Sequence, residues 1–224
     1  VAGEKLPMAP GDLVLTPSGL WHEHGHEGSD PVVWMDALDL PLIYNLDSSY
    51  AEEEALQNAP DVPDASKTRY TRSGLLPYDE LGSRADYPMM RYPWGDTRTA
   101  LINLAGSKAE NELVHLAYVN PVTGGECLPI LGCSAFMLRA GETAKLTRRT
   151  ASAVLYVLEG SGESRIDEHA ITWDAHDITA IPTYADVVIR NGSTSKPAFL
   201  FMVDDAPLQR RLRFYREFKS GEAL

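Results

Sequence analysis

The chain has 224 residues, a formal net charge of −12 and a pI near 4.9. Hydrophobic residues make up 44% and charged residues 23%, which is the composition of a soluble globular protein with a sizeable core. The acidic balance argues against nucleic acid and anionic membrane surfaces as partners, because both are bound by clustered Lys and Arg. No apolar run approaches the ~20 residues of a membrane span and no signal peptide is recognisable, so we expect a cytoplasmic protein.

The first part of the chain combines β-type runs with turns. A strand is predicted over residues 13–16, entered from the turn at 9–12, and a second strand over 31–39. Residues 47–57 are richer in Ala, Glu and Leu, and Ser48 or Ser49 can cap a short helix there. Five prolines punctuate residues 58–98, which are predicted to form a linker packed over a surface. A short helix is expected within 100–118.

The second half of the chain has the character of an all-β domain. Turn residues separate about seven predicted strands, over 134–138, 154–158, 162–166, 170–173, 178–182, 187–190 and 198–203. The chain closes with a predicted amphipathic helix over 207–218, whose Leu208, Leu212 and Tyr215 would dock on the barrel. Cys127 and Cys133 are expected to be reduced packing residues.

The histidines give the first indication of chemistry. His22, His24 and His26 occupy alternate positions within residues 21–27, so on a strand they could share one face. Neutral imidazoles suit iron, copper, zinc or nickel. A histidine-rich tip of a surface hairpin is the alternative. A faint repeat, in which residues 11–22 echo 176–187, suggests two copies of one β-fold.

These residues carry a family resemblance. Residues 11–22, Gly-Asp-Leu-Val-Leu-Thr-Pro-Ser-Gly-Leu-Trp-His, match the second cupin motif, and His26 stands where that motif has Asn. Within the cupins, residues 11–42 resemble the gentisate and salicylate 1,2-dioxygenases, and so do 119–125, 158–162 and 215–217. The resemblance covers most of the chain and is weakest in the linker.

The resemblance implies an all-β bicupin fold, with two jelly-roll barrels, a few short helices and a first barrel that is incomplete in this chain. Residues 1–57 would be the C-terminal part of the first, metal-binding barrel, and 58–118 a linker with short helices. Residues 119–206 would be a second, degenerate barrel, and 207–224 a C-terminal helix. By the same resemblance the protein is a homo-oligomer, specifically a tetramer.

The family resemblance also implies a site. In the family three His on the first barrel hold Fe(II), and His22 corresponds to the third of these ligands. His24 corresponds to a residue that contacts the substrate's oxygen groups, and Asp36 to a polar residue near the pocket. Both would form hydrogen bonds and handle protons. For Asp36, a buried structural carboxylate is an equal alternative. The substrate would be a small aromatic hydroxy acid, opened with O₂ between its two substituted carbons.

The chain also departs from the family pattern. The His-x-His pair that should precede Gly11 is absent, as is a substrate-binding Arg near it, so the sequence is expected to open inside the first barrel. In the second barrel, residues 147–149 (Thr-Arg-Arg) and Val187 stand at the ligand positions, although Asn191 matches. Arg and Val cannot ligate a cation, so this barrel is predicted to be structural. His115, His169 and His176 are expected to be surface or structural residues.

Three hypotheses follow. The first is an Fe(II)-dependent ring-cleaving dioxygenase for gentisate, salicylate or 1-hydroxy-2-naphthoate, acting in aromatic compound degradation. The second is a non-catalytic cupin fragment or binding module without a complete metal site. The third, a cupin isomerase or another metal enzyme, is disfavoured by the Trp-His-x-His-Gly run at 21–25 and by residues 34–39.

Overall fold

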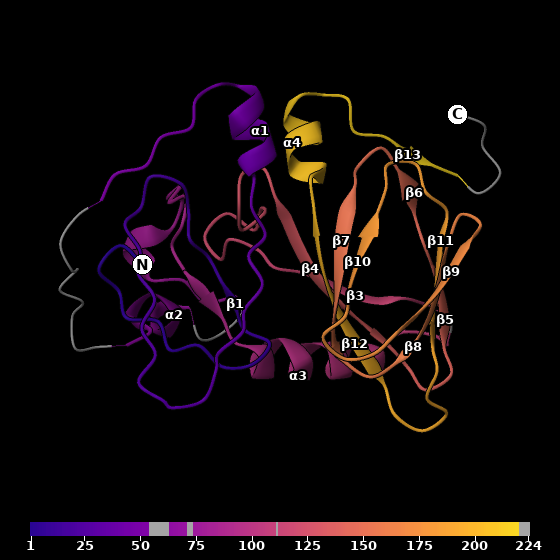
Figure 1. Cartoon of the computed structure of the whole chain (residues 1–224). Coiled ribbons are helices and arrows are strands. Elements are labelled where there is room, and N and C mark those ends of the chain that lie inside the picture. Colours follow the sequence, from indigo (N-terminus) through magenta and orange to yellow (C-terminus); the bar gives the residue numbers. More distant parts are fainter. Residues whose placement is uncertain (54–62, 71–73, 111, 220–224) are drawn as a thin grey trace.

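The computed structural model describes residues 1–53, 63–70, 74–110 and 112–219. Its main body is a sandwich of two antiparallel sheets (Figure 1). Across the described residues, one sheet has five strands in the order β10-β7-β12-β4-β3 and the other has four in the order β5-β11-β8-β9. The strands of the first sheet are β3 (Val114–Ala117), β4 (Gly132–Leu138), β7 (Ala153–Glu159), β10 (Ile178–Ile181) and β12 (Ala198–Asp204). Those of the second are β5 (Thr143–Leu146), β8 (Gly162–Ile166), β9 (His169–Trp173) and β11 (Val187–Asn191).

The strands of the two sheets differ in their pattern of buried and exposed side chains. β11 alternates buried and less buried side chains, as expected of a strand with one face toward the core. β4 and β12 are buried along almost their whole length, because both faces of the five-stranded sheet are covered. One face forms the core between the sheets with residues such as Phe136, Leu200 and Ile189. The other face forms a second core with Phe199, Phe201 and Leu101.

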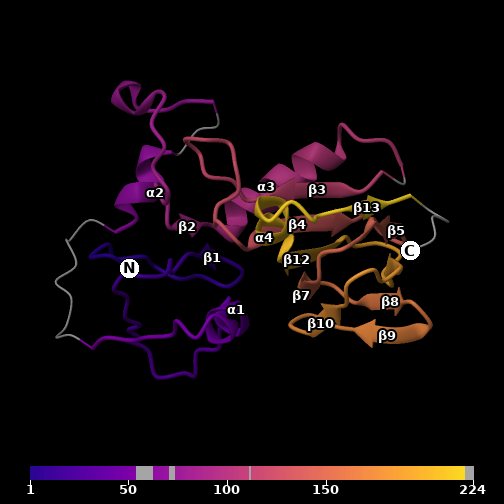
Figure 2. The same cartoon turned by 90° about the horizontal axis from the view of Figure 1, so that it is seen from above.

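Helix α3 (Trp94–Ala105) and the N-terminal segment build this second core. Seen from above, α3 lies along the five-stranded sheet on the side away from β8 and β9 (Figure 2). Leu15 of the N-terminal segment is 2% exposed in the same core, and Met35 packs against it. The segment that carries the candidate site is therefore attached to the outer face of the second barrel.

The N-terminal segment holds little regular structure. Strand β1 (Leu13–Val14) pairs with β2 (Arg91–Tyr92), so the strand predicted over 13–16 is present but short. The strand predicted over 31–39 was wrong: those residues pair with no strand, and Val33 is 93% exposed. The described elements here are the short helices α1 (Leu40–Asn45) and α2 (Ala65–Arg69) and the 3₁₀ helix η1 (Tyr78–Glu80). Residues 47–53 contain no helix, and the rest of the helix expected over 47–57 lies outside the described residues.

The predictions for the second half were closer. All seven predicted strands are confirmed, whereas β3, β5 and the two-residue β6 (Arg148–Arg149) were not predicted. The helix expected within 100–118 begins earlier, as α3, and β3 follows it. The C-terminal helix was predicted too long: α4 (Ala206–Arg211) ends early because β13 (Glu217–Phe218) pairs with β6. Leu212 is 60% exposed, and α4 docks instead through its buried Ala206, Pro207 and Gln209.

The two cysteines are free and buried, as predicted. They contact each other in the second core, where hydrogen bonding to Cys127 and burial raise the pKa of the Cys133 thiol. None of the helices in the described ranges combines the length and apolar character that a bilayer crossing requires.

Asp12 links the cupin motif to the rest of the fold. Its Oδ1 accepts a hydrogen bond from the backbone N–H of Trp94 at 2.8 Å, at the start of α3. Its Oδ2 accepts from Arg91 Nε at 2.8 Å and from the backbone N–H of Ala9 at 2.9 Å. Arg91 also pairs with Asp64, so one guanidinium joins two carboxylates that are mostly buried. This arrangement fixes the turn that begins the motif.

Gly11 is the point where this turn tolerates no side chain. Its φ is +84°, and a Cβ there would lie 2.7 Å from Cγ of Trp94. We predict that Gly11→Ala lowers the free energy of unfolding by about 3 kcal/mol, through backbone strain and overpacking together. Gly82 has a φ of +82° with nothing within 4 Å, so Gly82→Ala carries the strain alone and should cost about 1 kcal/mol. Urea unfolding measures both, and equal losses would contradict the contact with Trp94.

Candidate functional site

The histidine run, residues 22–26, follows a tight turn within the cupin motif of residues 11–22. Leu15 donates its backbone N–H to Met90 O at 2.8 Å, which holds the chain next to β2. Leu20 N–H then donates to Pro17 O at 3.2 Å, and Gly19 takes a φ of +77° to close the turn. Trp21 O accepts from the backbone N–H of Ala2 at 2.7 Å. The next residue, His22, is exposed at the surface, as are His24 and His26.

The structure brings two of the three histidines together. The ring centroids of His22 and His24 are 5.8 Å apart, and the rings are nearly perpendicular. His24 also stacks on Trp34, with centroids 5.0 Å apart and an interplanar angle of 16°. His26 turns away, because its Nε2 hydrogen-bonds Asp30 O at 2.7 Å in a local turn.

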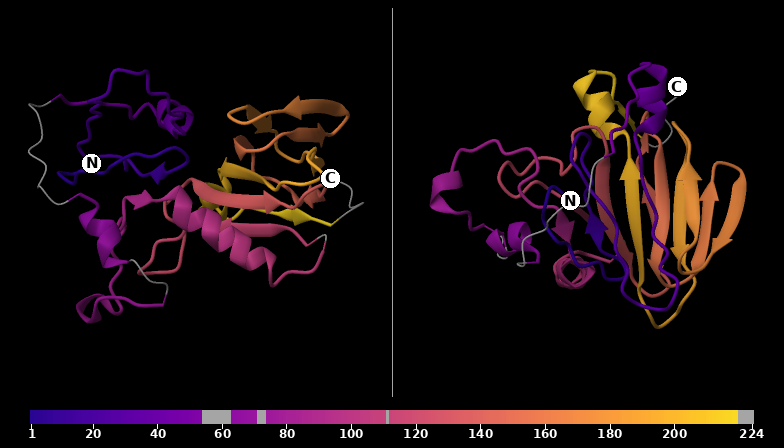
Figure 3. Two further views of the ribbon diagram at one scale, coloured as in Figure 1. Left: turned by 90° about the horizontal axis from the view of Figure 1, so that it is seen from below. Right: turned by 60° about the vertical axis from the view of Figure 1, so that its left-hand side comes forward.

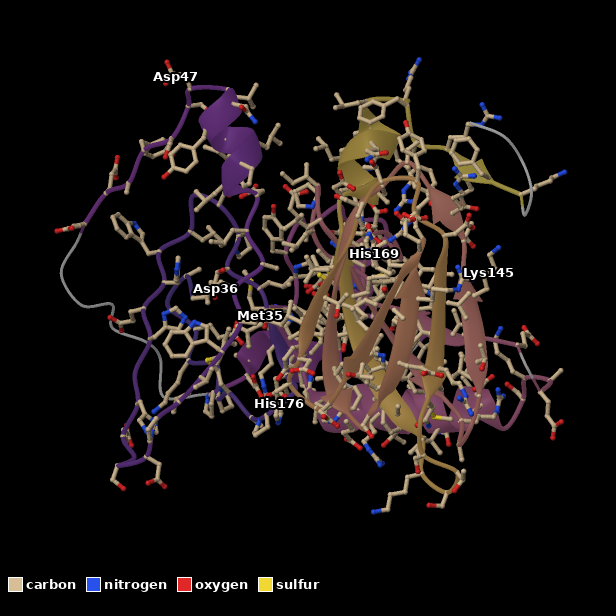
Figure 4. The ribbon with its side chains drawn as sticks, turned by 45° about the vertical axis from the view of Figure 1, so that its right-hand side comes forward. Met35, Asp36, Asp47, Lys145, His169 and His176 are labelled. Carbon is tan, nitrogen blue, oxygen red and sulfur yellow. The ribbon has the colours of Figure 1, made fainter. Side chains whose placement is uncertain are left out.

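Asp36 lies on the segment that faces this run. Trp34, the stacking partner of His24, precedes it by two residues, and Met35 between them packs into the second core. Figure 4 shows Asp36 beside Met35 on the N-terminal segment. Asp36 is exposed in the described structure. Trp34 was not predicted to belong to the site, and the alternation rule for strands could not have found it, because residues 31–39 form no strand.

The described residues do not form a complete metal centre. In the ranges that the structure covers, no group of three or more His, Cys, Asp or Glu is placed to hold a metal ion. His22 offers one exposed imidazole, whose Nδ1 lies 3.4 Å from Leu20 O. A hollow of about 540 Å³ lies between α2 and η1, but none of the candidate residues lines it.

In the second barrel the ligand positions are occupied by other interactions. Arg149 Nη2 lies 3.0 Å from Asp204 Oδ2 and 3.6 Å from Met202 Sδ. Val187 is 1% exposed and packs in the core between the sheets. Asn191 donates from its amide to Leu138 O, Arg139 O and Lys196 O, so it joins the end of β4 to the loop before β12. A guanidinium paired with a carboxylate thus stands at a position that the family resemblance matches to a metal ligand.

The other three histidines lie on strands and turns of the second barrel. His115 packs edge-on against Phe136, and desolvation lowers its pKa although part of the residue remains exposed. His176, in the turn after β9, has its Nδ1 2.7 Å from the Tyr156 hydroxyl oxygen. His169 is exposed at the start of β9 (Figure 4). These positions agree with the expected surface and structural roles.

Comparison with known proteins shows which of them this chain resembles. Residues 1–38 match the model of the cupin domain. A gentisate 1,2-dioxygenase from Ralstonia sp is 45% identical over 95% of this chain and 59% of its own length. A 5-aminosalicylate 1,2-dioxygenase from Comamonas sp is 37% identical over 97% of the chain and 58% of its own length. Over nearly its whole length the chain is similar to the gentisate and salicylate 1,2-dioxygenases.

Solved structures support this similarity. A salicylate 1,2-dioxygenase variant from Pseudoaminobacter salicylatoxidans, in complex with gentisate, superposes with a TM-score of 0.86 and 26% identity. That alignment covers 97% of this chain and 62% of the enzyme. The all-β bicupin fold predicted from the sequence is thereby confirmed. The chain spans about three fifths of the length of the relatives it matches.

The Arg149–Asp204 pair can be tested by removing one partner. The Asp204 side chain is 9% exposed, so Arg149→Met would leave a buried carboxylate without its partner. We predict a loss of about 3–5 kcal/mol in the free energy of unfolding, most of which the double change Arg149→Met with Asp204→Asn restores. The exposed pair Arg190–Glu163 has the same 3.0 Å separation, and Arg190→Met should cost less than about 1 kcal/mol. A double variant no more stable than Arg149→Met would argue against this role of the pair.

Proposed function

We propose that this chain is part of a ring-cleaving dioxygenase that opens a hydroxybenzoate such as gentisate or salicylate with O₂. The observation that carries the proposal is the His22–His24 pair at the end of the cupin turn, in a chain 45% identical over 95% of its length to a gentisate 1,2-dioxygenase. The family implies a metal cofactor, and we propose Fe(II). The reaction belongs to the degradation of aromatic compounds.

In this proposal His22 provides one imidazole ligand. Neutral imidazole suits iron, and a facial set of three ligands leaves positions open for other groups. Among the described residues, no second and third ligand stand with His22 in a metal-holding group. The metal, when bound, would supply the activation of O₂.

His24 and Asp36 bind and orient the substrate in this proposal. The stack on Trp34 fixes the plane of the His24 ring, so that a ring nitrogen can hydrogen-bond a substrate oxygen at a defined angle. Asp36, on the same segment as Trp34, accepts a hydrogen bond from the substrate hydroxyl or holds its proton. Trp34 is 47% exposed, and its face offers an apolar surface to an aromatic ring.

The substrate class follows from what the relatives share. Their names specify gentisate, 5-aminosalicylate and 1-hydroxy-2-naphthoate as substrates of those proteins. All three are aromatic rings with a hydroxyl beside a carboxylate. We therefore propose an aromatic acid of this pattern, with gentisate as the first compound to test.

A non-catalytic cupin is the second candidate. It is favoured by the lack of a complete metal-holding group in the part of the chain that the structure describes. Metal content of the full-length protein separates the two functions, because a binding module without metal would not consume O₂.

Substitutions of the histidines test the proposed roles. In the full-length protein loaded with Fe(II), we predict that His22→Ala loses both the metal and gentisate-dependent O₂ consumption. His24→Gln should keep the metal and lower kcat about 10²- to 10⁴-fold, the usual contribution of a proton-handling group. His26→Ala is the matched control and should change neither quantity, because His26 bonds only a local carbonyl in the described structure. Metal analysis and an oxygen electrode give the two readouts.

The results can also contradict the assignment. Metal retained at full stoichiometry in His22→Ala would remove His22 from the ligand set. Unchanged kcat in His24→Gln would leave His24 without a role in the reaction. A metal-loaded full-length protein that consumes no O₂ with gentisate, salicylate or 1-hydroxy-2-naphthoate would overturn the dioxygenase proposal.

A further inference from the structure

Trp94 is the residue at which the cupin motif meets the second barrel. It is the first residue of α3, and its backbone N–H donates to Asp12 Oδ1 at 2.8 Å. Its side chain lies so close to Gly11 that a Cβ there would be 2.7 Å from Cγ of the indole. The left-hand view of Figure 3 shows the start of α3 beside the N-terminal segment, with the rest of the helix along the five-stranded sheet. Trp94 therefore contacts the motif that leads to the histidine run.

The other side of Trp94 is bound to the second barrel. Its indole Nε1 donates to Glu159 Oε1 at 3.0 Å. Glu159 ends β7 and pairs in the sheet with Phe199, whose ring packs edge-on against the indole with centroids 5.5 Å apart. Arg98, one turn further along α3, donates from Nε to the same carboxylate at 3.0 Å, and its guanidinium carbon lies 4.8 Å from the centre of the Phe199 ring. One carboxylate and one aromatic ring thus hold α3 to the barrel.

The path from Trp94 to the histidine run follows hydrogen-bonded backbone. Strand β1 begins at Leu13, directly after Asp12, and pairs with β2, which ends two residues before Trp94. Leu15 then donates its N–H to Met90 O at 2.8 Å and is buried in the second core. Because these bonds fix the backbone from Asp12 to Leu15, a displacement at the start of α3 is passed along β1 toward the turn that precedes the histidines.

We propose that Trp94 and Glu159 are positioning residues for the histidine run. The Glu159 carboxylate fixes the indole, the indole and N–H of Trp94 fix the turn before β1, and β1 carries that placement to the histidines. Glu159 lies in the run 158–162 that resembles the gentisate and salicylate dioxygenases, and the catalytic proposal gives this run no role. The inference rests on the proposed function, and it adds that the second barrel sets the geometry of a site that it does not line.

Binding of Co(II) to the full-length apoprotein tests the link without turnover, because the visible spectrum of Co(II) reports its coordination geometry. Trp94→Phe keeps an aromatic ring but removes Nε1. We expect it to weaken Co(II) binding about 10-fold and to change the spectrum. With Fe(II), it should lower kcat for gentisate about 10-fold or more. Glu159→Leu should have the same effects, whereas Glu159→Gln still offers an oxygen to the indole and should stay within about twofold of wild type.

The matched control is Trp173→Phe. Trp173 is 3% exposed, and its Nε1 donates to Ser164 Oγ at 2.9 Å between β9 and β8, on the side of the barrel away from α3. The same change of side chain should therefore lower the thermal stability at least as much as Trp94→Phe, but leave the Co(II) spectrum and kcat unchanged. The double variant Trp94→Phe with Glu159→Leu should be little worse than Glu159→Leu alone, since both changes break one link.

The outcomes separate this proposal from the catalytic one. A Trp94→Phe protein with wild-type Co(II) affinity, spectrum and kcat would overturn the positioning role and leave the dioxygenase function intact. Equal changes in Trp173→Phe would also overturn it, because they would result from a general loss of stability. A wild-type protein that binds Co(II) but, with Fe(II), consumes no O₂ with gentisate would count against the catalytic proposal alone, since the Co(II) comparison still decides the role of Trp94. A wild-type protein that binds no Co(II) would overturn both.

Discussion

The five-stranded sheet is buried on both faces, and the rest of the structure depends on this constraint. One face closes the second barrel against the four-stranded sheet, while the other supports α3 and the N-terminal segment. Because β4 and β12 lie inside this sheet and are covered on both faces, they are almost entirely apolar, and the charged Asp204 at the end of β12 is paired with Arg149. The second barrel therefore has a structural role, because the N-terminal segment that carries the candidate site packs on its outer face.

The sequence predicted the strands of the second barrel because their signals are local. The runs 154–158 and 198–203 are apolar and bounded by turn residues, so their limits can be found without knowledge of their partners. Residues 31–39 also contain several apolar side chains but stay irregular in the described structure, since a strand needs an edge with which to pair. The helix predicted over 207–218 is too long for the opposite reason, because part of it finds a strand with which to pair. The apolar spacing of residues 207–218 is compatible with one helix, but Glu217 and Phe218 pair with β6 instead of continuing α4.

For the candidate site, the candidate residues could be predicted from the sequence, but the contacts between them could not. Alternation suggested that His22, His24 and His26 share a face, whereas the structure joins the first two and turns the third to Asp30. The motif located the turn, but it could not show that Asp12 anchors that turn to Arg91 and Trp94, which are about 80 residues away in the sequence. Such contacts arise from tertiary packing, which spacing within one motif does not encode. The roles of His22, His24 and Asp36 remain predictions.

The Arg149–Asp204 pair bears on how metal binding by this protein would be measured. A positive charge fixed inside the second barrel repels any divalent cation from that position, and its partner carboxylate is already engaged. Titration of the full-length protein with metal should then follow a one-site isotherm, without a weaker second phase from the other barrel. Metal content per subunit would consequently report the integrity of the first barrel alone. In a protein with two similar barrels, the measured metal content would then show directly which barrel holds the metal.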